Sequence, residues 1–373
     1  MKTTIMKKTL LLFVLFIGSG LNAQVLLTED GSTLLPGNVG TELTGIVPGQ
    51  GGWFTKNSVS STGTNADFQI VDVDLGAIYG NVIKITGYSG AAAATPPSNS
   101  RFMSKNIASA WTSRDFGNEI AEVEYEFYTG PATTSSNTMR VVLYDSEPTS
   151  TAPKMIAGFM ITMNPLSIRA LAWYDPTVDG GTGTIANYSI PLGSDGGSPP
   201  VFSQITLNTD TWYNIGFSYN ISTGELKFKG AGITRNSIQG ASIGTNVDNV
   251  QIIGSTGGTV AIPNTASSTG TFDNLIVRAT ATDTLLAVKE TTDSNTNFSV
   301  YPNPITNLIT VSSKNNAAIT AVSLTDLNGR IIKNQSFDTV AAIEMNVSDL
   351  ASGMYLMTIV SNEGTAIKKI VKN

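Results

Sequence analysis

The sequence predicts an all-β protein made of two antiparallel β-sandwiches, a large one followed by a small one. Short runs of alternating apolar and polar residues recur along the chain, separated by clusters of Gly, Asn, Asp, Ser and Pro. Only 13% of the 373 residues are charged and 36 are glycine, which is typical of a β-protein with many turns. No amphipathic helical pattern follows the first residues.

The N-terminal residues 1–23 predict a secretory signal peptide. Lysines precede the apolar run Leu10–Ile17, and a small, polar segment ends at Ala23. That run is too short to span a bilayer core of about 30 Å, and we expect no transmembrane segment after it. Loss of its three lysines takes the formal net charge from −6 to −9. Such an acidic protein is not expected to bind nucleic acid.

Residues 24–280 predict the large sandwich domain, because about ten strand-like runs follow one another with turn residues between them. The clearest run is "IAEVEYEFY". Its alternation places Val123, Tyr125 and Phe127 on one face and three glutamates on the other. The predicted strands are 68–75, 81–88, 120–128, 139–145, 155–163, 167–174, 212–220, 224–230, 249–254 and 271–279.

Two stretches of this domain resemble a known family. "TWYNIGFSYNISTGELKFKG" (211–230) is a strand, a tight turn and a second strand. "STGTFDNLIVRA" (268–279) places a small residue, Asp273 and Asn274 before an apolar strand. Both are similar to parts of laminin-G-like, concanavalin-type jelly rolls. The resemblance implies a jelly-roll fold for residues 24–280 and no particular activity.

Residues 281–297 predict a linker, since they are polar and lack a sustained period. About seven short strands are predicted in residues 298–373, the content of a minimal immunoglobulin-like sandwich. "LNGR" (327–330) predicts a hairpin turn between two of them. Pro302 and Pro304 mark the edge or the start of this domain, because proline cannot lie in a central strand.

This tail resembles the C-terminal sorting domain of type IX secretion cargo in Bacteroidetes. The resemblance implies that the tail is an address read by the type IX translocon, and that the protein is secreted or held at the outer cell surface. It also implies that the tail is usually cleaved. The alternative is an accessory sandwich without a sorting role. The residues that carry the resemblance are Tyr301–Pro304, Leu308, Asp326, Asn328–Arg330, Leu350, Gly353, Tyr355, Lys368, Lys369 and Lys372.

The residue types that are missing exclude several kinds of chemistry. The chain has no cysteine, so it has neither disulfides nor a thiol nucleophile. It also has no histidine. This excludes Ser-His-Asp triads, histidine-ligated zinc and histidine general bases. A polysaccharide lyase of the Tyr-His kind is disfavoured for the same reason.

The three glutamates of the run 120–128 allow one catalytic hypothesis. Retaining β-glucanases of the jelly-roll class carry Glu-x-Asp-x-Glu on one strand. By that template Glu122 is the nucleophile, Glu124 the orienting acid and Glu126 the proton donor. Glu replaces Asp at the middle position, and the aromatic cleft motifs of such enzymes are not recognisable. The alternative is the solvated face of a half-buried strand.

A non-catalytic carbohydrate-binding or adhesive module is the hypothesis that we favour. Sugar sites stack rings on exposed aromatic side chains. Trp53, Trp111 and Trp173 are the candidates, although tryptophan is more often buried. An inert structural role at the cell surface stays open.

No cofactor and no full metal-binding loop are predicted, but a structural calcium is conceivable. Asp72 and Asp74 lie on one face of a strand, and "DPTVDGG" (175–181) adds further oxygen ligands. Neither stretch has the complete spacing of a calcium loop.

Overall fold

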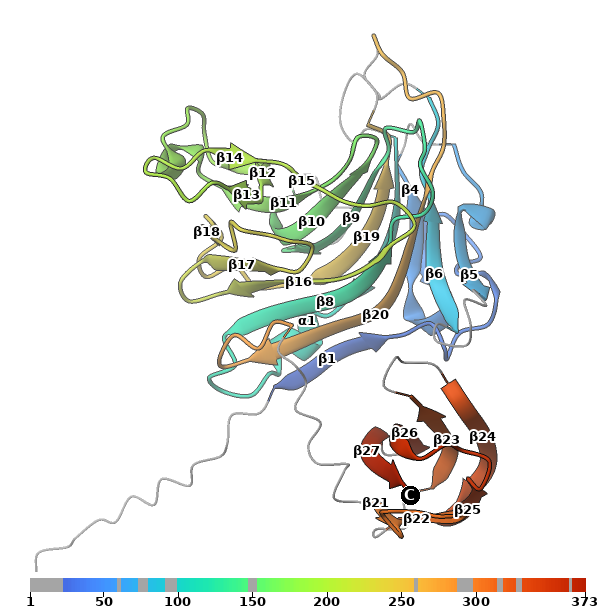
Figure 1. Cartoon of the computed structure of the whole chain (residues 1–373). Helices are drawn as coiled ribbons and strands as arrows, with labels where there is room; N and C mark the ends of the chain where they lie inside the picture. The colour runs from blue at the N-terminus through green and yellow to red at the C-terminus, as the bar shows by residue number, and fades with distance from the viewer. Residues whose placement is uncertain are drawn as a thin grey trace, which may run out of the picture. The chain divides into compact units, whose positions relative to one another are not determined.

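The regular secondary structure of the described residues is almost entirely β-strand, which confirms the predicted all-β fold (Figure 1). The chain divides into two compact units, residues 1–286 and 287–373. Except for Ala23, the predicted signal peptide lies outside the described residues. In the part of the chain that is described, no helix is long and apolar enough to cross a membrane. The computed structural model describes residues 23–58, 62–72, 80–90, 99–146, 153–257, 261–286, 298–313, 318–326, 331–361 and 364–373.

Two antiparallel sheets, here called sheet A and sheet B, pack face to face in the first unit. Sheet A has the order β18-β17-β16-β8-β20-β6-β5-β2, with β1 also paired to β20. Its strands are β1 (Gln24–Glu29), β2 (Gly37–Asn38), β5 (Phe68–Asp72), β6 (Asn81–Thr86), β8 (Ile120–Tyr128), β16 (Trp212–Asn220), β17 (Glu225–Lys229), β18 (Ser237–Gln239) and β20 (Thr269–Thr280).

Sheet B has the order β12-β11-β10-β9-β19-β7-β4-β3, with β15 also paired to β11. The chain crosses repeatedly between the sheets, as from β6 to β7 and from β8 to β9, which is the connectivity of a jelly-roll sandwich. Its strands are β3 (Thr44–Pro48), β4 (Phe54–Asn57), β7 (Ser100–Asn106), β9 (Thr138–Tyr144), β10 (Met155–Met163), β11 (Leu166–Tyr174), β12 (Ala186–Pro191), β15 (Ile205–Thr206) and β19 (Asn249–Ser255).

Short elements complete the first unit. Strands β13 and β14 form a separate two-stranded ribbon. A one-turn helix, α1, follows β7; the sequence did not predict it, because so short a helix has no apolar period. These elements are β13 (Gly193–Ser194), β14 (Phe202–Ser203), α1 (Ala108–Thr112) and the 3-10 turns η1 (Gln50–Gly52), η2 (Asn65–Asp67) and η3 (Pro176–Asp179).

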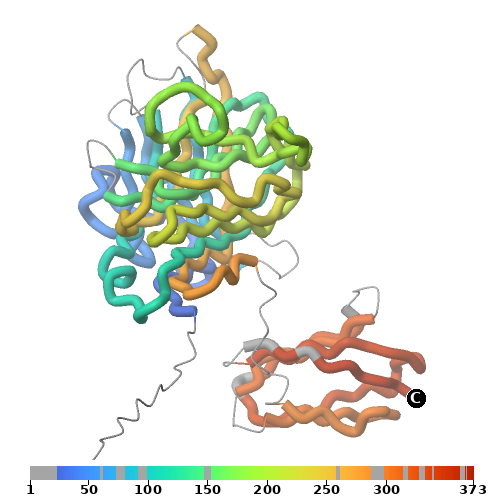
Figure 2. The backbone as a smooth tube through the Cα atoms, turned by 90° about the vertical axis from the view of Figure 1, so that its left-hand side faces the viewer, coloured from blue at the N-terminus to red at the C-terminus, as the bar shows by residue number. Residues whose placement is uncertain are grey.

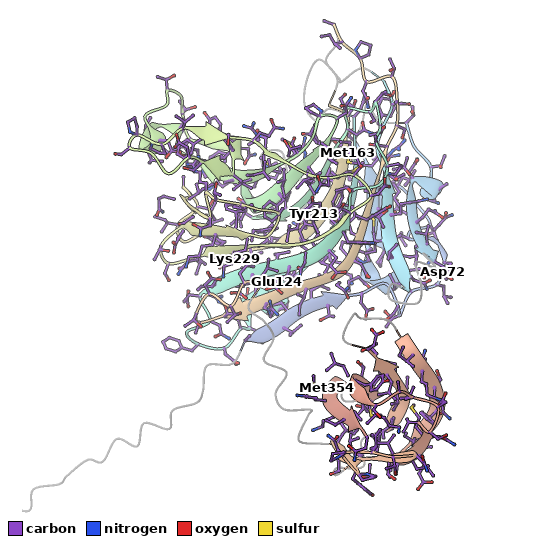
Figure 3. The ribbon with its side chains drawn as sticks, viewed as in Figure 1. Asp72, Glu124, Met163, Tyr213, Lys229 and Met354 are labelled. Atoms are coloured by element: carbon purple, nitrogen blue, oxygen red, sulfur yellow. The ribbon has the colours of Figure 1, made fainter. Side chains whose placement is uncertain are left out.

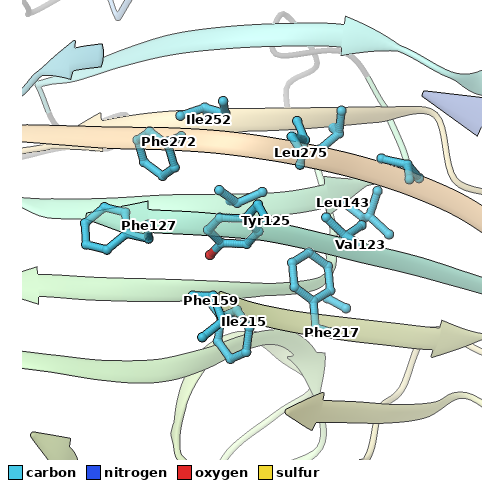
Figure 4. Close-up of a cluster of buried hydrophobic side chains, with 14 of the residues drawn as sticks. Val123, Tyr125, Phe127, Leu143, Phe159, Ile215, Phe217, Ile252, Phe272 and Leu275 are labelled. Carbon is cyan, nitrogen blue, oxygen red and sulfur yellow. The ribbon is translucent and has the colours of Figure 1, made fainter. Parts of the chain in front are cut away.

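The core between the two sheets is rich in aromatic side chains (Figure 4). Phe159 of sheet B meets Phe217 of sheet A edge-on, with ring centroids 5.6 Å apart and planes at 86°. Tyr125 lies between Phe159 and Phe272, at 6.5 and 6.1 Å. Such pairs add about 0.5–1.5 kcal/mol to the hydrophobic gain of burial. The alternation of β8 therefore fixes which of its faces is buried.

The second unit is a small sandwich of two layers (Figure 2). Its core includes Phe298 of the first strand and Ile370 of the last. The predicted turn at residues 327–330 lies outside the described residues. One layer is β21 (Phe298–Tyr301), β22 (Leu308–Ser313) and β25 (Ala342–Asn346), and the other is β23 (Ile319–Thr325), β24 (Ile331–Val340), β26 (Gly353–Ser361) and β27 (Gly364–Lys372).

The segment between β21 and β22 joins the beginning of this unit to its end. The side chain of Asn303 accepts from the N–H of Val371 at 2.8 Å and donates to the carbonyl of Lys369 at 2.9 Å. Ile305 forms a parallel bridge to Lys372, and its N–H donates to the Val371 carbonyl at 2.8 Å. The Pro-Asn-Pro stretch thus holds β27 in place.

Candidate functional site

Glu122, Glu124 and Glu126 lie on the outer face of sheet A, because the residues that alternate with them enter the core. Their register pairs Glu122 with Arg278 of β20 and with Ser218 of β16. The face is not open along its whole length. Glu122 is 0% exposed, and the other two are half-buried.

Residues 281–286, here called the strap, cross this outer face after β20 ends. The N–H and the hydroxyl of Thr284 donate to the Glu122 carboxylate at 2.5 and 2.7 Å. The N–H of Leu286 donates to Glu124 at 2.6 Å. The strap therefore belongs to the first unit. The prediction that a linker starts at residue 281 is wrong for these six residues, because they are fixed to strand β8.

The centre of the strap is packed as well as hydrogen-bonded. Leu285 is fully buried, and a Cβ added to Gly216 of β16 would lie 2.7 Å from its side chain. Lys229 donates to the carbonyl of Leu285 at 2.8 Å, and Lys227 and Lys229 both approach Asp283, at 3.4 and 3.5 Å. Glu124 and Lys229, labelled in Figure 3, come from neighbouring parts of sheet A.

Burial raises the pKa of Glu122, while the hydrogen bonds from Thr284 and the charge of Arg278 oppose that rise. Arg278 lies 3.6 Å from Glu122 and 2.5 Å from Glu124. The glycosidase hypothesis does not fit this arrangement, because a nucleophile must reach the sugar and Glu122 is enclosed. The three glutamates act here as acceptors and ion-pair partners for the strap and β20.

The third glutamate lies beside an irregularity in β20. Asn274 has a positive φ of 50° and donates from its side chain to Glu126 at 3.1 Å. The neighbouring Asp273 is buried, and burial raises its pKa to about 6, with Glu126 adding to the rise. The sequence resemblance singled out Asp273 and Asn274 for the fold, and both lie at this bulge.

Trp53 and Trp111 are both 0% exposed, so neither offers a ring face to a sugar. Trp53 donates to Glu29 at 3.1 Å, and Lys105 lies 5.0 Å from its ring. Trp111 lies in α1 under Arg114, whose guanidinium is 4.0 Å from the ring. The prediction that Trp53 and Trp111 stack on a sugar is therefore wrong, because both rings pack in the core.

Trp173 is the one candidate tryptophan that the structure places at a partly exposed position. It lies on the outer face of sheet B, since its neighbours Ala172 and Tyr174 belong to the core. The ammonium of Lys154 stands 5.6 Å from its ring centroid. A ring with one polar neighbour and some solvent contact is suited to stacking on a sugar.

The outer face of sheet B has an apolar floor. Longer side chains, among them Phe102 and Met160, pack against this floor and stay partly exposed. Gln251 and Asn249 of β19 lie on the same face and are hydrogen-bonded to each other at 2.7 Å. The floor consists of Val142, Tyr144, Met155, Leu171 and Ile253.

Two arginines rise from the same face, and sequence reasoning missed both. Arg140 donates from Nε to the hydroxyl of Thr138 at 3.2 Å, and Arg169 donates to the carbonyl of Ser189 at 3.0 Å. Burial lowers the pKa of the Arg140 guanidinium, and the nearby Tyr144 opposes that change. In sequence, "MRVVLYD" and "SIRALAWY" each carry one arginine in the outward phase of a strand.

Two of the carboxylates suggested as calcium ligands, Asp175 and Asp179, have other partners. Asp175 accepts from the N–H and hydroxyl of Thr177, and Asp179 pairs with Arg235 and accepts from Tyr174. Asp72 ends β5 (Figure 3), and Asp74 lies outside the described residues. Within the described ranges, no three acidic side chains gather in a way that could hold a metal.

The tail residues of the sorting resemblance lie on two paired strands. Gly353 and Tyr355 are on β26, opposite Lys372 and Ile370 of β27. The Tyr355 hydroxyl donates to the carbonyl of Ala351 at 2.9 Å, and its ring packs against the core. Lys369 is exposed, whereas Lys368 and Lys372 are half-buried.

Residues 299–373 match the family model described as "Secretion system C-terminal sorting domain". The protein is exported by type IX secretion. It therefore reaches the cell surface or the extracellular space, and its tail interacts with the type IX secretion machinery. No curated protein matches the chain.

Solved structures similar to the chain include polysaccharide-active enzymes. Alginate lyase vAL-1 from Chlorella virus has 11% identity and a TM-score of 0.42 over 68% of this chain and 99% of its own. The β-glucanase of Bacillus licheniformis has 9% identity and a TM-score of 0.34, over 66% and 97%. A sialidase has 9% identity and a TM-score of 0.36; 68% of this chain spans 18% of the sialidase.

Proposed function

We propose that the first unit is a non-catalytic carbohydrate-binding module, which the exported protein uses to contact glycan outside the cell. The binding surface is the outer face of sheet B around Trp173. One observation carries the proposal: this face combines a partly exposed indole, an apolar floor and two guanidinium groups that have no carboxylate partner among the described residues. Stacking surfaces beside hydrogen-bond donors are what sugar sites use.

A hydrolase at Glu122 and Glu126 receives no support, because the strap occupies the space above Glu122. An inert structural role does not account for the partly exposed indole of Trp173 or for the guanidinium groups of Arg140 and Arg169 on the same face. A surface-adhesive role remains within the proposal, since adhesion through glycans needs the same binding face.

A glycan array with the chain from Gln24 to Asn373 tests the proposal. We expect binding that Trp173→Ala weakens about tenfold, since an aromatic contact is worth about 0.5–1.5 kcal/mol beyond its buried area and about 1.4 kcal/mol corresponds to tenfold in affinity. Phe116→Ala is the matched control, because Phe116 is 98% exposed in another part of the unit. An array without binders contradicts the proposal. So does release of reducing ends from β-glucan that Glu122→Gln abolishes.

A further inference from the structure

The two sheets differ in the charges that their strands carry. Sheet A contains both signs, with Glu122, Glu124, Glu126, Lys227 and Arg278 among them. None of the strands of sheet B contains Asp or Glu. Those strands carry the cations Lys56, Arg101, Lys105, Arg140 and Arg169.

Residues outside sheet B neutralise part of this positive charge. Arg101 pairs with Asp67 at 3.0 Å, and Lys105 pairs with Glu29 at 2.9 Å. Across the described ranges, no carboxylate lies within ion-pair distance of Arg140 or Arg169. In the described part of a chain of net charge −6, two guanidinium groups on one face thus have no ion-pair partner.

The two arginines lie in one row across the sheet. Met160 of β10 is opposite Arg169 on one side and Arg140 on the other. Two strand spacings separate their Cα atoms, roughly 10 Å. Ile253 and Phe102 continue the same row beyond Arg140. The row therefore presents one cation on each side of the Met160 thioether, followed by the apolar side chains of Ile253 and Phe102.

An unpaired guanidinium near apolar groups gains most from an anion. Removal from water disfavours the charged form, and a negatively charged partner compensates for that loss. Guanidinium binds carboxylate and sulfate oxygens through paired N–H donors. Asp145 and Asp248 adjoin β9 and β19 beyond Tyr144. The Asp145 carboxylate accepts from the Lys154 backbone N–H, and the Asp248 carboxylate accepts from the Asn249 side chain.

We infer that the glycan bound on this face is acidic, and that Arg140 and Arg169 hold successive anionic groups along it while Trp173 stacks on a ring. This inference rests on the proposed function and names its ligand class. The shared chemistry is a polyanionic sugar chain, whether its charge comes from carboxylates or from sulfates.

Matched polymers test the inference on the chain from Gln24 to Asn373. The carboxylate arm compares polygalacturonate with its methyl ester, and the sulfate arm compares dextran sulfate with dextran. We expect at least one anionic polymer to bind about tenfold or more tightly than its neutral counterpart. The binding should weaken between about 0.05 and 0.5 M salt, because salt screens exposed charges.

The arginine variants locate the effect. Arg140→Gln and Arg169→Gln should each weaken anionic binding about tenfold, and Arg140→Lys less, since it keeps the charge but loses the paired donors. Lys84→Gln removes a cation from β6 of sheet A and should leave binding unchanged. Thermal unfolding of each variant shows that the fold is retained, and Arg140→Lys keeps the test decisive should the glutamine variant unfold.

The outcomes separate the ligand class from the function itself. Equal binding to charged and neutral polymers, or full binding by both glutamine variants, overturns the acidic ligand and leaves glycan binding intact. If none of the four polymers binds, the acidic ligand class is also overturned. Binding of neutral glycans on the array then decides whether the proposed function stands. Anionic binding that Lys84→Gln abolishes equally would overturn the assignment to this face.

Discussion

Thr284 donates two hydrogen bonds to the carboxylate of Glu122, one from its N–H at 2.5 Å and one from its hydroxyl at 2.7 Å. The two residues are 162 positions apart, yet this contact fixes where the first unit ends. A buried carboxylate needs donors to be stable, and the strap supplies them. The strap and β8 therefore depend on each other.

Thr284→Val should destabilise the first unit by about 1–3 kcal/mol, because the buried Glu122 loses a donor while the side-chain shape is kept. Urea unfolding of the chain from Gln24 to Asn373, followed by tryptophan fluorescence, measures the change. Thr282→Val is the control, since Thr282 is exposed. Equal midpoints for the two variants would show that the strap adds no stability.

Gly216→Ala should destabilise the unit by about 1–3 kcal/mol, because the new methyl group would lie 2.7 Å from the Leu285 side chain. Leu285→Ala alone should cost about 2–3 kcal/mol from the lost burial. The double variant should cost less than the sum, since the shortened side chain removes part of the clash. Additive costs would contradict the packing of the strap against β16.

Asp273→Asn should make the first unit more stable at pH 7–8, by about 1–3 kcal/mol. Burial raises the folded-state pKa of Asp273 to about 6, above its unfolded value of 3.8. The folded wild type therefore loses stability as the pH rises from about 4 to about 6, and the asparagine variant does not. Urea titrations from pH 4 to pH 8 should show the advantage growing through that range. Asp115→Asn, a substitution at an exposed position of the same unit, is the control variant.

Asn303→Ala should lower the fraction of protein that leaves a cell with type IX secretion machinery. It removes both hydrogen bonds that hold β27 to the Pro-Asn-Pro stretch. Immunoblots of medium, surface and periplasm measure the distribution. Asn307→Ala is the matched control, since Asn307 is exposed and the substitution keeps its backbone carbonyl, which accepts from the Val347 N–H. Normal export of Asn303→Ala would show that this contact is not needed for sorting.

Strands such as β8 could be predicted because they carry their own alternation, whereas β1, β7 and β12 were not among the predicted runs. Val123, Tyr125 and Phe127 identify the buried face of β8 without knowledge of any other strand. The strap could not be predicted in this way. Thr284 and Leu285 have no periodic neighbours, and their partners Glu122 and Gly216 are far away in sequence. A long-range contact of this kind leaves no local pattern.

The site was harder to predict than the fold, because it depends on which strands share a sheet. The sequence around Trp53 and Trp111 does not distinguish them from Trp173. Only the packing shows that the first two rings are buried and the third is partly exposed. Arg140 and Arg169 are isolated cations within their own strands. Their common face becomes visible only once β9, β10 and β11 are known to be neighbours.

The bridge between Ile305 and Lys372 has a consequence for the timing of export. The ribosome makes Ile305 well before β27, so the address stays unfinished until residues 364–373 have emerged. A chain broken off between residues 287 and 363 carries the first unit but lacks β27, so its address stays open. Fold closure in the tail would then require that β27 has been made before the outer membrane is crossed.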